Sequence, residues 1–501
     1  MSNPLGDNEF DGQIVVASRI VDYLSSGLYQ SPAACLKELI NNAYDADANR
    51  VDVYVKPDAN RIIIEDDGSG MNRADFEKNF KRISESYKRE ESDVTPSGRP
   101  KIGKIGIGFI AANEICDVME IVSTKVGSDE LLEVSINFDL MRQDHNERRK
   151  SDTEFAKADY RGHVSKTDMS SHFTKVFLKK VRGDAQSILS GVGTSAYASG
   201  KISLYGLTAN SIFKKLHSPS LKSWSEFDAY SKNILEVGLN VPVSYYKNWL
   251  PATLRKEVGD IEVAANQLNF NLFFDGSEVL KPIVFNPEDK RTLISRFEYE
   301  GKHVSAIGYF YAQHTRINPQ EIQGLLLRIR NSAVGNYDPN FLGYSPTLGP
   351  LFQSWISGEI MADDRLEDSM NIDRRTLRIA HPAYVELQQA VHDHLDKLIK
   401  RVKNEIYGVG SQERQIEKAE KIKKKILEVT SQEIAKIDKD IASEVKKAWN
   451  VSTTNVSNQK MILKKYSVDE LYEIMVEVAQ EFMTHAQLQK FIRRLTERLH
   501  Q

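Results

Sequence analysis

Three short segments between Glu38 and Phe109 constrain most strongly what this chain can fold into. The first has a helical pattern with a glutamate and an asparagine one turn apart. The second is an apolar strand that ends at Asp66 and runs into a glycine-containing turn, and the third, residues 103–108, is rich in glycine and leads into another helix. A helix, strands and a glycine-rich loop in this order predict mixed α/β structure.

The first segment places three polar residues on one face of a helix. Ser31 and Pro32 supply an N-cap and a first-turn proline, so we predict that a helix begins there. Glu38 and Asn42 are four residues apart and Asp45 lies two turns beyond Glu38, so the three side chains share a face. A carboxylate able to activate water would lie beside an amide oxygen suited to Mg²⁺, which keeps water and phosphate as most of its ligands.

The second segment places a carboxylate at the end of a strand. Residues 51–55 alternate between apolar and polar types, and residues 61–66 form a second apolar run, so both predict strands. A partly buried carboxylate at Asp66 could accept a hydrogen bond from the exocyclic amine of a base. Gly68 and Gly70 would let the backbone approach a ring closely.

The third segment favours phosphate. Residues 89–108 are rich in glycine, so we predict a mobile loop there, followed by a helix from Phe109 onward. The bare backbone N–H groups of Gly103, Gly106 and Gly108, next to a helix N-terminus, suit a phosphate group. The chain has no P-loop sequence and no strand directly before this run, which disfavours a P-loop or a Rossmann site.

The order and spacing of the three segments resemble the GHKL ATPase superfamily, which includes DNA gyrase, the ninety-kilodalton heat-shock chaperone, histidine kinases and MutL. The run from Lys37 to Ala46 is most similar to the chaperone branch, and residues 274–276 are similar to MORC-type relatives. The resemblance implies a Bergerat-type α/β sandwich, in which helices cover one face of a mixed sheet. It also implies ATP and Mg²⁺ as ligands, and ATP hydrolysis.

The resemblance assigns roles to individual residues. Glu38 would be the general base and Asn42 the Mg²⁺ ligand, while Asp66 would bind the adenine amino group directly and through water. The remaining positions expected to contact nucleotide are Asp45, Gly68, Gly70, Met71, Asn79, Gly103, Gly106, Gly108, Phe109 and Thr174. Phe173 replaces the glycine that precedes this threonine in the chaperone.

Two basic positions stay open at this point. A lysine that contacts nucleotide in the chaperone falls on Glu85, with Lys81 and Lys88 as neighbouring alternatives. A later segment is similar to a chaperone segment whose arginine reaches the γ-phosphate from the second domain. Arg374 is the matching position and would be catalytic, and Arg375 is its adjacent competitor.

The chain is predicted to have three parts. Residues 1–255 would form the ATP-binding domain with its glycine-rich lid. Residues 256–400 would form a second, transducer-like α/β domain that begins with a strand at 271–274. Residues 401–501 would be helical and mediate dimerisation or partner binding, with a long amphipathic helix over 413–449.

The composition of the chain limits its expected binding partners and its expected location. The net charge of −3 provides no overall attraction to nucleic acid or an anionic membrane, although local basic faces leave nucleic acid open. No run approaches the roughly 18 apolar residues of a membrane span, and the N-terminus lacks the pattern of a secretory signal. Cys35 and Cys116 lack metal-binding spacing. We expect a cytoplasmic protein with two buried thiols and no membrane partner.

Two functions remain as hypotheses. The first is a Mg²⁺-dependent ATPase whose cycle opens and closes a homodimer around a macromolecular client. The second is a nucleotide-sensing module with negligible turnover that recruits an effector, in association with nucleic acid or in phage defence. Glu38 favours the first, because a sensor could dispense with a general base.

Overall fold

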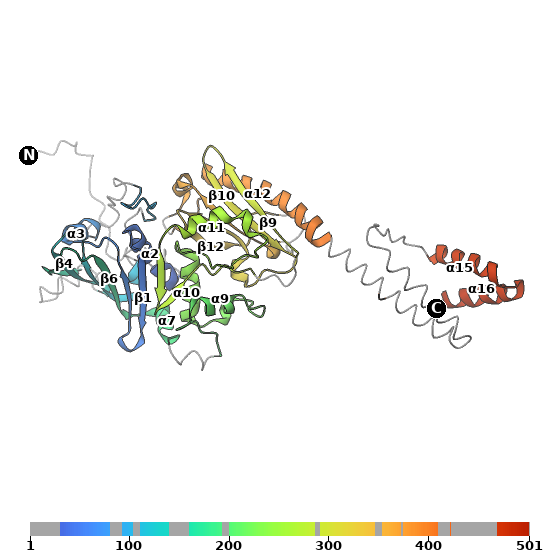
Figure 1. The fold of residues 1–501 in the computed structure, drawn as a ribbon, viewed down its shortest axis with the longest axis horizontal. Coiled ribbons are helices and arrows are strands. Elements are labelled where there is room, and N and C mark those ends of the chain that lie inside the picture. The colour runs from blue at the N-terminus through green and yellow to red at the C-terminus, as the bar shows by residue number, and fades with distance from the viewer. Residues whose placement is uncertain are drawn as a thin grey trace, which may run out of the picture. The chain divides into compact units, whose positions relative to one another are not determined.

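The computed structural model describes residues 31–80, 93–103, 111–139, 160–192, 200–285, 291–345, 353–371, 374–408, 421 and 468–499. The chain divides into two units, residues 1–411 and 412–501. The first unit contains two β-sheets with their helices (Figure 1). The described part of the second contains helices α15 (Val468–Phe482) and α16 (His485–Leu499). Apart from residue 421, the helix predicted over 413–449 lies outside the described residues.

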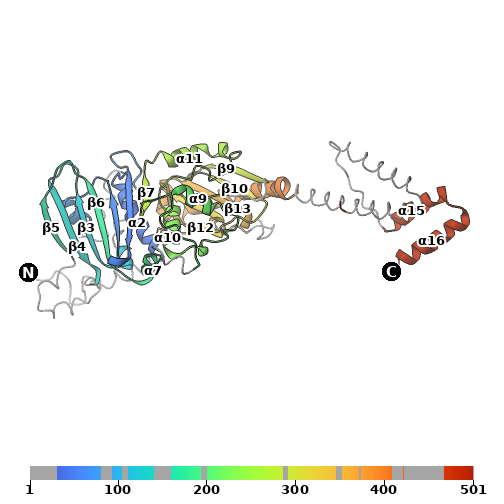
Figure 2. The same ribbon diagram turned by 60° about the horizontal axis from the view of Figure 1, so that its bottom comes forward.

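The first sheet has eight strands in the order β5-β4-β3-β6-β2-β1-β7-β8. Neighbouring strands are antiparallel except for β1 and β7, which are parallel, so the sheet is mixed as predicted. Figure 2 shows β5, β4, β3 and β6 at one end of this sheet. The strands are β1 (Arg50–Lys56), β2 (Arg61–Asp66), β3 (Cys116–Thr124), β4 (Glu130–Asn137), β5 (Tyr160–Lys166), β6 (Phe173–Val181), β7 (Asn271–Phe274) and β8 (Ser277–Val279).

Helices cover one face of this sheet, as the α/β sandwich prediction requires. Strand residues such as Val53 and Ile62 point to that face and are fully buried beneath the helices. The opposite face carries ion pairs such as Lys175 to Glu65, with 2.8 Å between nitrogen and oxygen. The fold class expected from sequence is therefore confirmed. The covering helices are α2 (Pro32–Asp45), α4 (Ala112–Ile115), α7 (Gln186–Ser190) and α10 (Ala229–Asn240).

The second sheet has five strands in the order β12-β11-β13-β10-β9. Helix α12 packs on one face through residues such as Leu387 and Val391, and α9 and α11 pack on the other. Helix α10 contributes Ile234 to the first core and Leu235 to this one, so it joins the two sheets. The elements are β9 (Thr292–Glu300), β10 (Ser305–Gln313), β11 (Gly324–Ile329), β12 (Ser332–Asp338), β13 (Ile356–Ala362), α9 (Ala209–Leu216), α11 (Gly259–Asn266) and α12 (Pro382–Arg401).

Three segments differ from the expectations. Residues 271–274 form β7, which pairs with β1 and extends the first sheet instead of starting a second one. The helix expected from Phe109 to Cys116 is confined, in its described part, to Ala112–Ile115, because Cys116 already pairs in β3. Strand β5 was not predicted, because its half-exposed residues lack the apolar alternation of a buried strand.

Two further observations bear on the setting of the protein. Cys35 and Cys116 are both free and buried, as predicted. Within the ranges described above, the structure has no helix with the length and apolar character needed to cross a membrane.

Candidate functional site

Three polar side chains form a row on the covered face of the first sheet. Asp66 on β2 lies opposite Thr174 on β6, and Thr174 lies opposite Ser123 on β3. All three residues are buried, and the hydroxyl oxygens of Thr174 and Ser123 are 3.0 Å apart. Buried polar groups set in an apolar wall are what orient a small ligand in a binding site. The sequence singled out Asp66 and Thr174, and the sheet register brings them together.

Asp66 supplies the carboxyl group of this row, and its pKa is shifted. Burial raises the pKa of Asp66 to about 7, and a hydrogen bond from the Gly68 amide, 3.0 Å from Oδ1, partly opposes this rise. A ligand amine that donates a hydrogen bond to this carboxylate would favour its ionised form. The carboxyl group can therefore recognise a donor at neutral pH.

The turn after β2 needs glycine because of its own backbone contacts. Gly70 has φ +65°, and a Cβ atom there would lie 1.8 Å from the carbonyl oxygen of Thr124. A Cβ atom on Gly68 would lie 2.8 Å from the carbonyl oxygen of Ala46. Both glycines are thus required for the turn to pack between α2 and β3, whatever ligand it contacts.

Two side chains that the sequence analysis did not single out hold this turn. The Met71 amide donates to the Ser123 hydroxyl at 2.9 Å, which places Met71 beside the polar row. The Gly68 carbonyl oxygen lies 2.8 Å from Nδ1 of His172. A lone serine in an apolar strand and a lone histidine in a loop give no local signal, so only the folded contacts reveal them.

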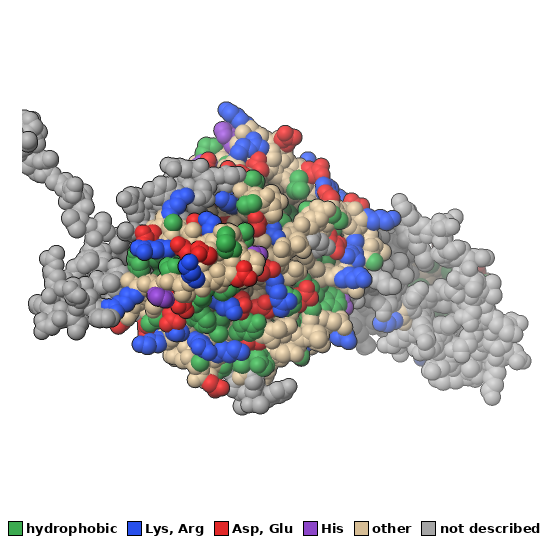
Figure 3. Space-filling model, turned by 60° about the vertical axis from the view of Figure 1, so that its left-hand side comes forward, with side chains coloured by type: hydrophobic (Ala, Val, Ile, Leu, Met, Phe, Trp, Pro, Cys, Tyr) green, Lys and Arg blue, Asp and Glu red, His purple; other side chains and the backbone are tan. Residues whose placement is uncertain are grey.

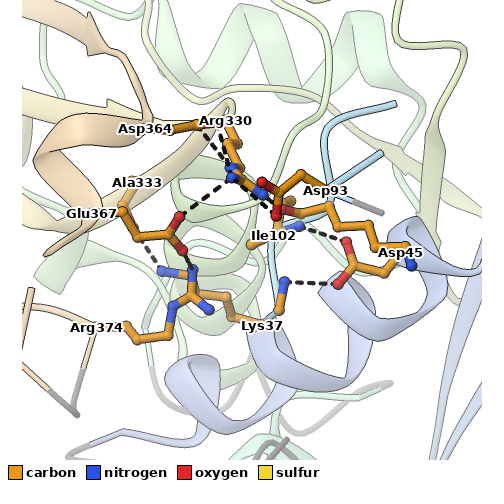
Figure 4. A network of polar contacts seen from close by, with 11 residues as sticks. Lys37, Asp45, Asp93, Ile102, Arg330, Ala333, Asp364, Glu367 and Arg374 are labelled. Atoms are coloured by element: carbon orange, nitrogen blue, oxygen red, sulfur yellow. Dashed lines mark hydrogen bonds and ion pairs between the residues drawn. The ribbon is translucent and has the colours of Figure 1, made fainter. Parts of the chain in front are cut away.

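The three residues predicted to share a face of α2 have different surroundings. The Asp45 carboxylate accepts hydrogen bonds from the amides of Ile102 and Gly103, both at 2.7 Å (Figure 4). Asn42 is exposed and Glu38 is half-buried. Asp45 therefore connects the helix to the start of the glycine-rich segment, and its predicted contact with nucleotide remains a prediction.

A small cavity lies beside Glu38. Its volume is about 20 Å³, and about 10–15 Å³ by this measure is enough for one water molecule. A second carboxylate, Glu236 on α10, lines the same cavity, and burial raises the pKa of Glu236. The lining residues are Ser31, Ala33, Ala34, Lys37, Glu38, Glu236, Asn240, Asn336 and Arg375.

Lys37 connects α2 to the second sheet. Its buried ammonium group donates to the carbonyl oxygen of Ala333 on β12 at 2.6 Å. Burial lowers the pKa of Lys37 to about 8, with Glu38 opposing the effect and Arg374 adding to it. A hydrogen bond therefore joins α2, the helix that carries Glu38, directly to β12 of the second sheet.

The two candidate arginines lie in different surroundings. Arg374 lies 3.7 Å from Glu367, measured from Nη2 to Oε1, and has a left-handed backbone with φ +52°. Arg375 lines the cavity beside Glu38. Arg375 and Glu38 thus line the same cavity. Arg374 instead pairs with the carboxylate of Glu367.

One residue of the site, Asn42, could bind Mg²⁺ directly. The Asn42 side chain is exposed and has no hydrogen-bond partner among the described residues, so its amide oxygen is available. The described residues include no group of three or more His, Cys, Asp or Glu that could hold a metal ion. An ion held at Asn42 would take its other ligands from water and a phosphate-bearing ligand, which is the usual habit of Mg²⁺.

Several predicted positions cannot be placed. Asn79 lies in helix α3 (Arg73–Phe80), but its side chain is not described. The remaining positions outside the described residues are Lys81, Glu85, Lys88, Gly106, Gly108 and Phe109.

Comparison with known proteins gives one family and a set of relatives. Residues 29–173 match the family described as "Histidine kinase-, DNA gyrase B-, and HSP90-like ATPase". The chain is 39% identical over 107 residues to a putative type II restriction enzyme, HgiDII, of Herpetosiphon aurantiacus, covering 21% of this chain and 17% of that protein.

Chaperone relatives match a similar length of chain. The chaperone protein HtpG of Methylobacterium sp. (strain 4-46) is 31% identical over 152 residues, which cover 26% of this chain and 24% of the chaperone. HtpG of Bacillus subtilis (strain 168) is 28% identical over 136 residues, 23% of this chain and 21% of the chaperone. The chain thus spans about a quarter or less of these relatives, so their similarity is evidence about one domain.

Proposed function

Because residues 29–173 match the GHKL ATPase superfamily, we propose that this protein binds ATP with Mg²⁺ and hydrolyses it. The observation that carries the proposal is the water-sized cavity beside the half-buried carboxylate of Glu38. A hydrolase needs a general base in contact with one water molecule, and a cavity large enough for one water beside Glu38 supports this role.

Adenine recognition is assigned to the row on the covered face of the first sheet. Asp66, in its ionised form, accepts a hydrogen bond from the adenine amino group, and Thr174 and Ser123 offer hydroxyls beside it. The turn at Gly70 and Met71 would form the pocket wall. This assignment is supported by the burial of all three polar side chains, because a buried carboxyl group discriminates strongly between a donor and an acceptor.

We assign hydrolysis to Glu38 and to an arginine of the segment between β13 and α12. Glu38 takes a proton from water, the water oxygen bonds to the γ-phosphorus, and the bond from that phosphorus to the ADP oxygen breaks. Arg374, with Arg375 as the alternative, stabilises charge on the transferred group. When bound at Asn42, Mg²⁺ would neutralise charge on the phosphate oxygens.

Dimerisation through the second unit is part of the proposal. Helix α15 exposes several large apolar side chains, and Phe482 at its end is 81% exposed. Exposed apolar groups that gather on one short helix favour contact with another chain. We assign this unit to dimerisation or partner binding, in a cycle in which ATP closes a homodimer around a macromolecular client. The domain boundaries at residues 255 and 400 and a cytoplasmic location stay part of this proposal.

The nucleotide-sensing module remains the second candidate. The similarity to a putative restriction enzyme favours a nucleic-acid-associated client or effector for it. On the face of the molecule shown in Figure 3, however, Lys and Arg side chains are interspersed with Asp and Glu, so that face offers no continuous basic surface. The effector of such a sensor would then be a protein, or a nucleic acid that binds another face of the molecule.

Glu38→Ala separates the two candidates. If Glu38 is the base, the substitution preserves ATP affinity in calorimetry and lowers turnover by about 10²-fold or more. Glu236→Gln is the matched comparison, because it alters the other carboxylate of the same cavity. Turnover that survives in Glu38→Ala but falls in Glu236→Gln would assign the base to Glu236. A wild-type protein that binds ATP without measurable turnover would favour the sensor.

A further inference from the structure

The hairpin between β11 and β12 ends in an unusual turn. Arg330 and Asn331 connect the two strands, and both have left-handed backbones, with φ +53° and +66°. Two consecutive positive φ values belong to the tight hairpin turn that normally uses asparagine and glycine. An arginine in this conformation is strained, and strain of this kind is concentrated at functional positions.

The Arg330 side chain is the centre of a polar network (Figure 4). The side chain is 2% exposed. Its Nε and Nη2 atoms donate hydrogen bonds to the two carboxylate oxygens of Asp364, at 2.8 and 2.9 Å. Another of its nitrogens donates to the carbonyl oxygen of Lys101. It also lies 3.4 Å from a carboxylate oxygen of Glu367 and 3.9 Å from one of Asp93. One buried cation thus meets the segment 93–103 and the segment that carries Glu367.

The hairpin backbone contacts the opposite side of the site. The carbonyl oxygen of Ala333 accepts the hydrogen bond from Lys37, 296 residues away in the chain. Gly335 has φ +72°, and a Cβ atom there would lie 2.5 Å from the carbonyl oxygen of Arg375. The hairpin therefore contacts the helix that carries Glu38, the segment 93–103 and the backbone of Arg375.

We propose that Arg330 is a positioning residue that fixes two phosphate-binding elements relative to each other. On one side, Arg330 holds Lys101, two residues before Gly103. On the other side, it holds Glu367, which in turn pairs with Arg374. Arg330 thereby links the position of residues 101–103, which Asp45 also anchors, to the position of the Arg374 guanidinium.

This inference rests on the proposed function, because it assigns both elements to the γ-phosphate of ATP. ADP lacks that group, so the spacing of the two elements affects ATP more than ADP. Loss of Arg330 would release both residue 101 and Glu367, so Glu367 would no longer hold Arg374 at its present position relative to residue 103.

The test uses three variants of the full chain. Arg330→Gln removes the central cation, and Glu367→Gln removes the link to Arg374 while leaving the pair of Arg330 with Asp364. Arg365→Gln is the control, because Arg365 is a half-exposed arginine of the same region that pairs with Asp363 at 2.7 Å. The measurements are ATP and ADP affinity by calorimetry, turnover, and thermal unfolding.

Arg330→Gln is expected to lower the ratio of ATP to ADP affinity about tenfold, the effect of losing one charge-assisted contact. Turnover is expected to fall about 10- to 100-fold, since a misplacement of about 1 Å has that effect. ADP affinity and the Arg365→Gln control stay at the wild-type level. Glu367→Gln lowers the same ratio, and it decides the question if Arg330→Gln fails to fold.

An unchanged ATP to ADP ratio in Glu367→Gln and in a folded Arg330→Gln would overturn the inference and leave the proposed function standing. Equal losses of ATP and ADP affinity, together with a lower melting temperature, would also overturn it, since they indicate a purely structural role. A wild-type protein that binds neither nucleotide would overturn the proposed function itself, and this inference with it.

Discussion

Asp45 and Gly103 are joined by a hydrogen bond of 2.7 Å between the carboxylate and the backbone amide. The other oxygen of the same carboxylate accepts the amide of Ile102. The helix that carries Glu38 and Asn42 is therefore fixed to the start of the glycine-rich segment. Asp45 would act on nucleotide through the position of this segment.

Asp45→Asn is expected to loosen that segment. An amide has one acceptor oxygen where the carboxylate has two, so one of the two backbone donors loses its partner. Hydrogen exchange at the Ile102 and Gly103 amides should accelerate about tenfold, as expected for the loss of one charge-assisted bond. Asp47→Asn is the control, because Asp47 bonds to Ser97 in the same segment. Equal exchange rates at residue 103 in both variants would contradict the anchoring role of Asp45.

Asp66→Asn is expected to abolish ATP binding. The Asn amide group can present a donor where the adenine amine requires an acceptor, so affinity should fall at least about 10²-fold. Glu65→Gln is the matched control, because Glu65 is on the opposite face of the same strand and pairs with Lys175. Calorimetry that finds wild-type affinity in Asp66→Asn would remove Asp66 from the adenine pocket.

The raised pKa of Asp66 predicts a pH dependence of stability. In the folded chain the pKa is about 7, against about 3.9 in an unfolded chain. Between these values the folded state holds a proton that the unfolded state has lost, so the free energy of unfolding falls as pH rises from about 4 to 7. The contribution is on the order of a few kcal/mol, since each pKa unit corresponds to about 1.4 kcal/mol.

Urea unfolding of the wild type and Asp66→Asn at pH 5 and pH 7.5 measures this contribution. The difference in unfolding free energy between the two proteins should shift in favour of the variant at the higher pH. Other titrating groups are common to both proteins and cancel in the difference. A difference that does not change with pH would show that Asp66 ionises normally in the folded chain.

Arg374→Ala and Arg375→Ala decide which arginine serves the γ-phosphate. Loss of the correct one should slow hydrolysis at least about tenfold, the effect of one charge-assisted contact in the transition state. ADP affinity should stay unchanged, because ADP lacks the group that the arginine binds. We expect Arg374→Ala to have this effect. If only Arg375→Ala has it, the cavity shared by Arg375 and Glu38 identifies the catalytic pair.

A site completed by both sheets also predicts a change of shape. ATP should favour a compact form of the protein and ADP a looser one, because only ATP supplies the charge that the arginine binds. Small-angle scattering with a non-hydrolysable ATP analogue and with ADP measures this difference. Identical profiles would contradict the opening and closing cycle and favour the sensor.

The sequence by itself predicted the resemblance of the N-terminal part to GHKL ATPases, the fold class and several elements of the first sheet. Each of these signals is local: the capped start of α2 at Ser31, the spacing of Glu38 and Asn42, and the strand that ends at Asp66 all occur within a few residues. Local spacing is enough to define the face of a helix or the end of a strand. These local patterns were therefore enough to predict an α/β sandwich, and the first sheet of the structure confirms that prediction.

Only the tertiary structure decided how distant segments meet. The bond from Lys37 to Ala333 spans 296 residues, and the bond from Arg330 to Lys101 spans 229. The pairing of residues 271–274 with β1 is a contact of the same kind. Such contacts depend on strand register and on the packing of helices between two sheets, and no pattern within a short stretch of sequence encodes them. The row of Asp66, Thr174 and Ser123, the cavity beside Glu38 and the Arg330 network therefore appear only when the chain is folded.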